Sequence, residues 1–110
     1  MIKVVFYKDS DDCYRGFQLK GHAGFAEYGH DIVCAAVSAL AINTVNSIEK
    51  FTDDKFDCKV NEKNGIMDLQ FSSKVSSETT LLLDSFQLGL MGIKEDNAGY
   101  ISVKTRRWKL

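Results

Sequence analysis

The segment from Gly21 to Leu40 places a cysteine near the start of an apolar helix, directly after a glycine-rich loop that carries two histidines. The spacing predicts Asp31 as the helix N-cap. Cys34 would then lie in the first turn, where unpaired backbone N–H groups and the helix dipole stabilise negative charge. A thiol in that position ionises more readily, and His22 or His30 could accept its proton. This pattern is typical of a nucleophilic thiolate.

Each of these residues also has a purely structural interpretation. A cysteine on an apolar helix is more often a small core residue than a nucleophile, and Cys13 and Cys58 fall in predicted strands away from any helix end. His22 could be a solvated loop residue, and an exposed, non-catalytic role is favoured for His30. Spacing alone leaves these alternatives open.

The elements that would position the cysteine follow from the hydrophobic pattern. Helical spacing predicts one helix from Ile32 to about Phe51 and a second, capped by Ser76 or Ser77, that ends near Lys94. Alternating apolar residues predict strands, with a hairpin turn at Asn64-Gly65, over residues 2–7, 13–20, 56–60, 67–71 and 100–105. The order ββαββαβ predicts an α+β fold, with two helices packed on a mainly antiparallel sheet.

Composition and charge fit a single domain over residues 1–110. The chain has 14 basic and 15 acidic residues and a net charge of −1, which predicts no direct nucleic-acid binding. A local basic run, Lys104 to Lys109, is interpreted as the solvated end of the last strand, with docking to RNA or to an acidic surface as the alternative.

Three scattered cysteines argue against a disulfide framework and suit a reducing compartment. The apolar stretch from Ile32 to Ile42 is interrupted by Ser38 and is too short to span a bilayer, and the N-terminus has no signal-peptide pattern. We therefore expect a cytoplasmic protein that does not enter a membrane.

Metals and cofactors receive little support. The cysteines and histidines lack the short paired spacings of structural zinc sites. The loop glycines do not form a phosphate-binding pattern, and Asp31 would repel a phosphate at that helix start. We expect neither a metal nor a cofactor.

Both predicted helices are unusually apolar. The first is apolar on every face over 32–42 except at Ser38, and the second is nearly so over 81–93. One small sheet offers limited surface to cover both helices. We therefore expect a homodimer with a hydrophobic contact that involves one of the helices.

The motif GHAG, four residues, Gly29, one residue and then DIVCAAVSAL resembles the ribosomal-processing cysteine protease family. The resemblance is specific over 21–46, and the chain length and the predicted element order extend it over the whole sequence. It implies that His22 and Cys34 form the catalytic dyad, and that His30 occupies a variable position. It also implies a single domain that dimerises through its helices.

The activity implied by the resemblance is that of a cysteine endopeptidase in ribosome assembly. Its substrate would be the short N-terminal extension of a large-subunit ribosomal protein, number twenty-seven of the bacterial set, cut after two aromatic residues and before a small one. His22 would withdraw the proton of Cys34, and the N–H groups of residues 32–34 are candidates to stabilise the oxyanion. The alternative is a non-catalytic, dimeric, ribosome-associated binding module in which Cys34 is a core residue.

Several residues could support the dyad. Asp31 could orient His22 as well as cap the helix, and Ser38 could line the floor of a pocket. A loop that is mobile without substrate would close over an extended peptide, with Phe25 or Tyr28 meeting its aromatic residues. The residues assigned to this substrate loop are Gly21, Gly24, Phe25, Tyr28 and Gly29.

Overall fold

The computed structural model describes residues 1–21 and 28–109, with only the backbone described for residues 28–31. These residues form elements in the predicted order ββαββαβ. The strands and helices are β1 (Ile2–Lys8), β2 (Tyr14–Lys20), α1 (Tyr28–Phe51), β3 (Phe56–Asn61), β4 (Ile66–Phe71), α2 (Ser77–Asp96) and β5 (Ile101–Arg107).

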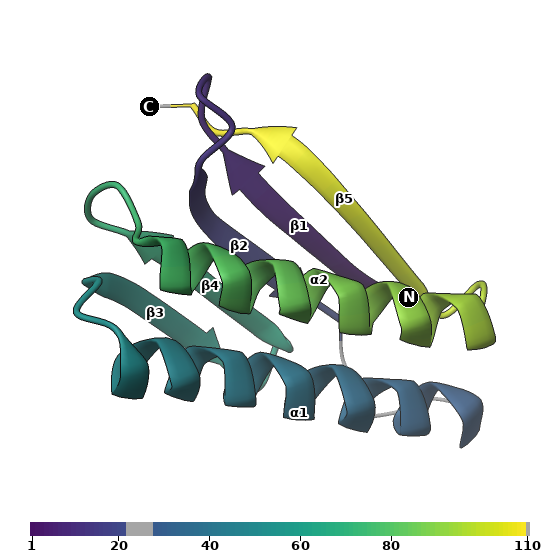
Figure 1. The fold of residues 1–110 in the computed structure, drawn as a ribbon. Coiled ribbons are helices and arrows are strands. Elements are labelled where there is room, and N and C mark those ends of the chain that lie inside the picture. Colours follow the sequence, from purple (N-terminus) through teal and green to yellow (C-terminus); the bar gives the residue numbers. More distant parts are fainter. Residues whose placement is uncertain (22–27, 110) are drawn as a thin grey trace.

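The strands form one mixed sheet in the order β3-β4-β2-β1-β5, and both helices lie on the same face of it (Figure 1). Three strand pairs are antiparallel, and only β1 and β5 run parallel among the described strands. The parallel pair arises because α2 carries the chain across the sheet between β4 and β5. The predicted α+β fold, with two helices on a mainly antiparallel sheet, is confirmed.

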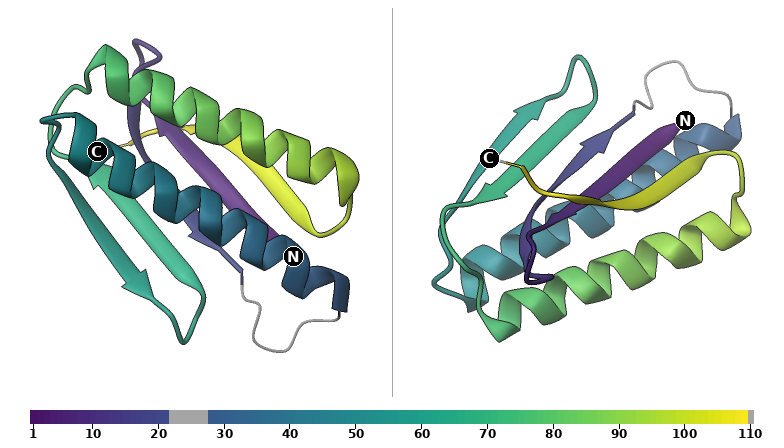
Figure 2. Two further views of the ribbon diagram at one scale, coloured as in Figure 1. Left: turned by 60° about the horizontal axis from the view of Figure 1, so that its bottom comes forward. Right: turned by 90° about the horizontal axis from the view of Figure 1, so that it is seen from above.

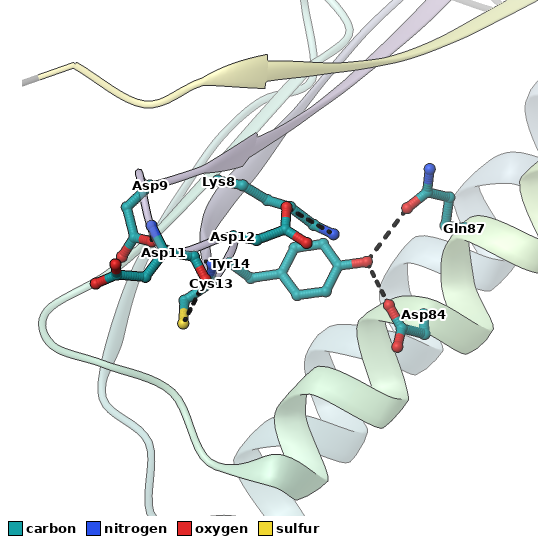
Figure 3. Close-up of polar contacts among 8 residues, drawn as sticks. All are labelled: Lys8, Asp9, Asp11, Asp12, Cys13, Tyr14, Asp84 and Gln87. Atoms are coloured by element: carbon teal, nitrogen blue, oxygen red, sulfur yellow. Dashed lines mark hydrogen bonds and ion pairs between the residues drawn. The ribbon is translucent and has the colours of Figure 1, made fainter.

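The core lies between the helices and the inward face of the sheet. Phe6, Phe17 and Phe86 pack edge to face or tilted, with ring centroids 5.2 to 6.1 Å apart. Tyr14 joins this cluster and points its hydroxyl at α2, where it donates to Asp84 Oδ1 at 2.6 Å (Figure 3). Burial, together with this carboxylate, raises the pKa of Tyr14. The tyrosine therefore stays neutral and ties β2 to α2.

Helix α1 begins at Tyr28, one turn earlier than the predicted start at Ile32. The prediction of Asp31 as the N-cap is therefore wrong. Helical carbonyls at residues 28–31 accept the N–H groups of residues 32–35, so the added turn satisfies donors that a helix starting later would leave unpaired.

The length of α1 also corrects the expectation about membranes. The segment Ile32–Phe51 is long and apolar enough to cross a bilayer by length and composition alone, with a mean hydropathy of 1.5. However, Val33, Val37, Ala41 and Ile48 of this helix are almost completely buried in the core. These residues belong to the one third of the segment that is buried, and the absence of a membrane span remains a prediction.

Helix α2 has the predicted cap, Ser76, whose hydroxyl accepts a hydrogen bond from the backbone N–H of Thr79 at 3.2 Å. The carboxylate of Asp54 supports this cap. Its Oδ2 accepts from the backbone N–H of Ser76 at 2.9 Å, from the Ser76 hydroxyl at 2.7 Å and from the Thr79 hydroxyl. Burial by itself raises the pKa of Asp54, but the hydrogen bonds outweigh it and hold the pKa below its ordinary value.

The first prediction concerns this cap. Asp54→Ala is expected to lower the free energy of unfolding by about 2 kcal/mol at pH 7, because it removes hydrogen bonds to a charged acceptor. A depressed carboxyl pKa stabilises the fold above the unfolded-state pKa, and this contribution is lost as the pH falls through the folded-state pKa. Urea denaturation should therefore show a difference from wild type that shrinks in acid.

The matched control is Asp53→Ala, one residue away, where the carboxylate is exposed. It should change the unfolding free energy by less than about 0.5 kcal/mol. Equal losses for both variants, or a loss at Asp54 that persists unchanged in acid, would contradict the role assigned to its carboxylate.

Candidate active site

Cys34 lies on α1 with only 6% of its surface exposed, among the residues of the hydrophobic core. All three cysteines belong to the described residues, and none of them forms a disulfide. Burial alone fits a core thiol. One turn further along α1, however, the residues around the helix form a pocket.

A pocket of about 260 Å³ lies along α1 one turn beyond Cys34. Ser38 contributes to its wall, as the sequence analysis proposed for a pocket floor. The opposite wall is the hairpin of β3 and β4, and most of the lining is apolar. The lining residues are Leu19, Gly21, Ser38, Ala41, Ile42, Val60, Asn61, Glu62, Gly65, Ile66 and Met67. Its volume is at the small end for ligand sites and suits side chains of a peptide better than a large cofactor.

Gly21 holds the end of β2 at this pocket. Its backbone N–H donates to the carbonyl oxygen of Gly65 at 3.0 Å, which joins β2 to the turn of the β3–β4 hairpin. Its φ of +134° favours glycine, and a Cβ would lie 2.7 Å from the Cα of Ile2. The chain that leads into His22 therefore starts from a fixed point in the pocket wall.

His22 lies outside the described residues, as do Gly24 and Phe25, so the dyad of His22 and Cys34 stays a prediction. The backbones of Tyr28 and Gly29 belong to the first turn of α1, so the prediction that the loop extends through residue 29 is wrong. A helix that starts at residue 28 lets these residues supply carbonyls to the next turn, and their role in substrate binding stays a prediction. The predicted mobility of the loop concerns mostly residues outside the described ranges.

The earlier helix start moves Cys34 into the second turn of α1. The N–H groups of residues 32–34 then bond within the helix, so the prediction that they are free to hold a thiolate or an oxyanion is wrong. The unpaired donors of this helix end belong to residues 28–31. Because the dipole effect fades beyond the first turn, the helix end stabilises a thiolate at Cys34 less than it would at a first-turn position.

The hairpin wall of the pocket was missed by sequence reasoning. Val60 and Met67 were predicted to lie in strands, and the Asn64-Gly65 turn was recognised, but the contact of these strands with α1 depends on the strand order. β4 pairs with β2, which places the hairpin beside the strand that leads into the pocket. Alternation along one chain carries no signal for that pairing.

Within the described residues, no group of three or more histidine, cysteine, aspartate or glutamate side chains is arranged to hold a metal ion. The side chains of His22 and His30 are not among those described. The expected absence of a metal therefore remains a prediction.

Comparison with known proteins adds independent findings. The sequence model of the family described as "Cysteine protease Prp" matches residues 1–102. Two curated relatives are both described as ribosomal processing cysteine protease Prp. The one from Staphylococcus aureus is 33% identical over 78 residues, covering 71% of this chain and 74% of the relative. The one from Bacillus subtilis is 28% identical over 109 residues, covering 96% and 97%.

Solved structures agree with these matches. The S. aureus protease Prp in complex with a substrate peptide superposes with a TM-score of 0.90 at 27% identity, covering 96% of this chain and 100% of the other. The same protease with a covalently linked product peptide gives a TM-score of 0.86 at 28% identity, with the same coverage. Both similarities extend over nearly the whole fold.

Proposed function

Because this chain belongs to the cysteine protease Prp family and is a cysteine protease, we propose that it removes the N-terminal extension of large-subunit ribosomal protein twenty-seven during ribosome assembly. The observation that carries this proposal is the apolar pocket along α1, one turn from Cys34. Relatives of the same fold hold a substrate peptide and a covalently linked product peptide. A pocket beside a nucleophile is where side chains next to a scissile bond would bind.

In the proposed mechanism, His22 accepts the proton of the Cys34 thiol, and the sulfur attacks the scissile carbonyl carbon. Collapse of the tetrahedral intermediate breaks the C–N bond, and His22 returns the proton to the departing amine. The extension is then held as a thioester on Cys34. Water, deprotonated by His22, hydrolyses this thioester and restores the free enzyme. Asp31 is proposed to orient His22 in these steps.

The pocket accounts for the proposed cleavage preference. Ile42 and Val60 are 51% and 56% exposed and present apolar surface at the pocket, together with Met67. An aromatic side chain that binds there would remove this surface from water, which favours an extended peptide with aromatic residues before the cleavage point. Ser38 and Asn61 offer polar groups in the same lining.

The proposal is tested by incubating the enzyme with the extended ribosomal protein and measuring the mass of the product. We expect the mass to fall by that of the extension alone. A substrate in which the aromatic pair is replaced by aspartate is the control and should remain intact. An unchanged mass for the native substrate, or equal cleavage of both, would contradict the proposed specificity.

The second candidate is a dimeric, ribosome-associated binding module without chemistry, and the burial of Cys34 is the observation that favours it. The same incubation separates the two candidates. A binding module would form a complex with the extended protein and leave its mass unchanged.

We also propose that the protein is cytoplasmic and a homodimer. Exposed apolar side chains follow one stripe of α2: Leu81 is 69% exposed, Leu88 75% and Met91 43%. On α1, Ile32 is 58% exposed. A second copy packed on these helices would cover surface that a monomer leaves in water.

The second prediction tests this dimer by light scattering at micromolar concentration. Wild type should show the mass of two chains, and Leu88→Glu combined with Met91→Glu should show the mass of one, because buried carboxylates at an apolar contact are costly. Val60→Glu is the control, since it adds a charge at an exposed apolar residue of β3 and should leave the mass unchanged. A monomeric wild type at every concentration would contradict the proposal.

A further inference from the structure

Apart from the end of the chain at Trp108 and Lys109, the described residues leave the face of the sheet opposite the helices uncovered (Figure 2). Side chains alternate along each strand, so Ile2, Val4 and Phe6 of β1 point into the core, and Lys3, Val5 and Tyr7 point to the open face. The residues of β2 and β5 that pair with Lys3, Val5 and Tyr7 point to the same open face, so the side chains form rows across the strands. Lys3 pairs with Lys20 of β2 and with Ser102 of β5, and Tyr7 pairs with Arg106.

Charge is strongly segregated onto this open face. The registers and the stacking of Arg15 place six basic residues there, whereas Asp57 and Asp68 are the acidic residues of the same rows. The basic residues are Lys3, Arg15, Lys20, Lys59, Lys104 and Arg106. The face is therefore clearly positive although the whole chain has a net charge of −1. The prediction that the protein does not bind nucleic acid used only the net charge of the whole chain, which adds the charges of all its faces.

The basic groups of the open face form no ion pair with any other described residue. The acidic residues of these rows, Asp57 and Asp68, lie on β3 and β4, whereas five of the six basic residues lie on β1, β2 and β5. Asp9 and Asp12 of the β1–β2 turn lie near Arg106, so the positive charge is partly compensated at that end of the face, and the excess is carried mainly by Lys3, Lys20 and Lys104. Such an excess attracts a polyanion.

A groove of about 490 Å³ lies on this face, and its lining combines the basic residues Arg15, Arg107 and Lys109 with one acidic residue, Asp68. Trp108 stands at its edge and stacks on Arg15, with the guanidinium carbon 4.1 Å from the ring centroid. Tyr7 lines the same groove, so two aromatic side chains are available there. Gln18 and Gln70 line it as well and provide amide donors and acceptors.

We propose that this open face binds single-stranded RNA. Basic residues in and beside a groove with two aromatic side chains match a chain of phosphates that carries bases, and aromatic and guanidinium planes stack with unpaired bases. The glutamine amides can bond to base edges. A five-stranded sheet face with exposed aromatic side chains favours splayed single strands, whose bases can stack, over a duplex. This inference does not depend on the proposed protease substrate, because it uses a different face of the molecule.

The test is fluorescence anisotropy of a labelled single-stranded RNA of mixed sequence, about twenty nucleotides long, with the full chain at low salt. We expect binding that weakens steeply as salt increases. Lys104→Glu with Arg106→Glu should weaken it by about tenfold or more. Trp108→Ala should weaken it by about fivefold or more through lost stacking, and Trp108→Phe should restore most of the affinity.

The matched control is Lys50→Glu with Lys94→Glu, which makes the same change in net charge on the helix layer and should keep wild-type affinity. The inference is overturned if the control weakens binding as much as the change at Lys104 and Arg106. It is also overturned if poly-glutamate of equal charge binds as tightly as the RNA, because that result assigns the face to acidic protein surfaces.

Discussion

Cys34→Ser is expected to reduce cleavage of the extended ribosomal protein by about 10⁴-fold or more, which is the scale seen when a covalent nucleophile is removed from a hydrolase. A serine hydroxyl has a much higher pKa than a thiol, so a neutral histidine cannot ionise it in a site built for sulfur. The change is nearly isosteric. Since Cys34 is 6% exposed, the serine hydroxyl would be buried in the core and should lower the free energy of unfolding by about 1 to 3 kcal/mol, so a cooperative unfolding transition above the assay temperature is the check that the variant is folded.

Cys58→Ser is the matched control for this experiment. Cys58 lies on β3 and is partly buried against the core. Its replacement should leave kcat/KM within about a factor of three of wild type, because surface and strand positions outside a site change rates little. Substantial cleavage by a folded Cys34→Ser variant would remove Cys34 from the mechanism.

His22→Ala is expected to reduce kcat by about 10³-fold or more, with a smaller effect on KM. The position of Cys34 in the second turn of α1 makes this loss larger than a first-turn cysteine would suffer. The helix end contributes less to holding the thiolate there, so the base provides most of the activation.

His30→Ala is the matched control for the base and should retain most of the activity. Single-turnover cleavage with excess enzyme separates the chemical step from substrate binding. An inactive His30 variant combined with an active His22 variant would show that the base was assigned to the wrong histidine.

The fold was largely accessible from the sequence because its signals are local. Alternation at Ile2, Val4 and Phe6 located β1, and the Asn64-Gly65 pair located the β3–β4 hairpin. The Ser76 cap located the start of α2. The parallel pairing of β1 with β5 was not accessible, since it joins residues almost a hundred positions apart and depends on how the layers pack.

The start of α1 was predicted wrongly for a physical reason. Asp31 is a strong N-cap residue by type, but capping competes with helix extension, and each added helical residue gains a backbone hydrogen bond. The tertiary structure decides between the two, and here the helix continues back to Tyr28. A residue type that favours capping therefore indicates where a helix can start but does not determine where it starts.

In the candidate site, too, local features could be predicted from the sequence, and features that depend on the packing of distant elements could not. Cys34 and Ser38 could be placed on one helix face from their spacing of four residues. The pocket could not be predicted, because its second wall comes from Val60 and Met67 on the hairpin, which the sheet order brings to α1. The uneven charge of the open sheet face was also hidden in a net charge that sums over the whole chain.

The most direct test of the central claim, that Cys34 is a nucleophile activated by His22, is the rate at which iodoacetamide alkylates each cysteine at pH 7, followed by mass spectrometry. Burial and the nearby carboxylates of Asp68 and Asp57 raise the pKa of Cys58, which makes it an internal reference of low reactivity. Exposure alone would make Cys34 the slower of the two, since it is the more buried.

We predict the opposite order. Cys34 should react about ten times faster than Cys58 or more in the wild-type protein, and this advantage should disappear in His22→Ala, because only an ionised thiol reacts quickly. If Cys34 reacts more slowly than Cys58, and at the same rate with and without His22, it is a structural core thiol and the proposed dyad is contradicted.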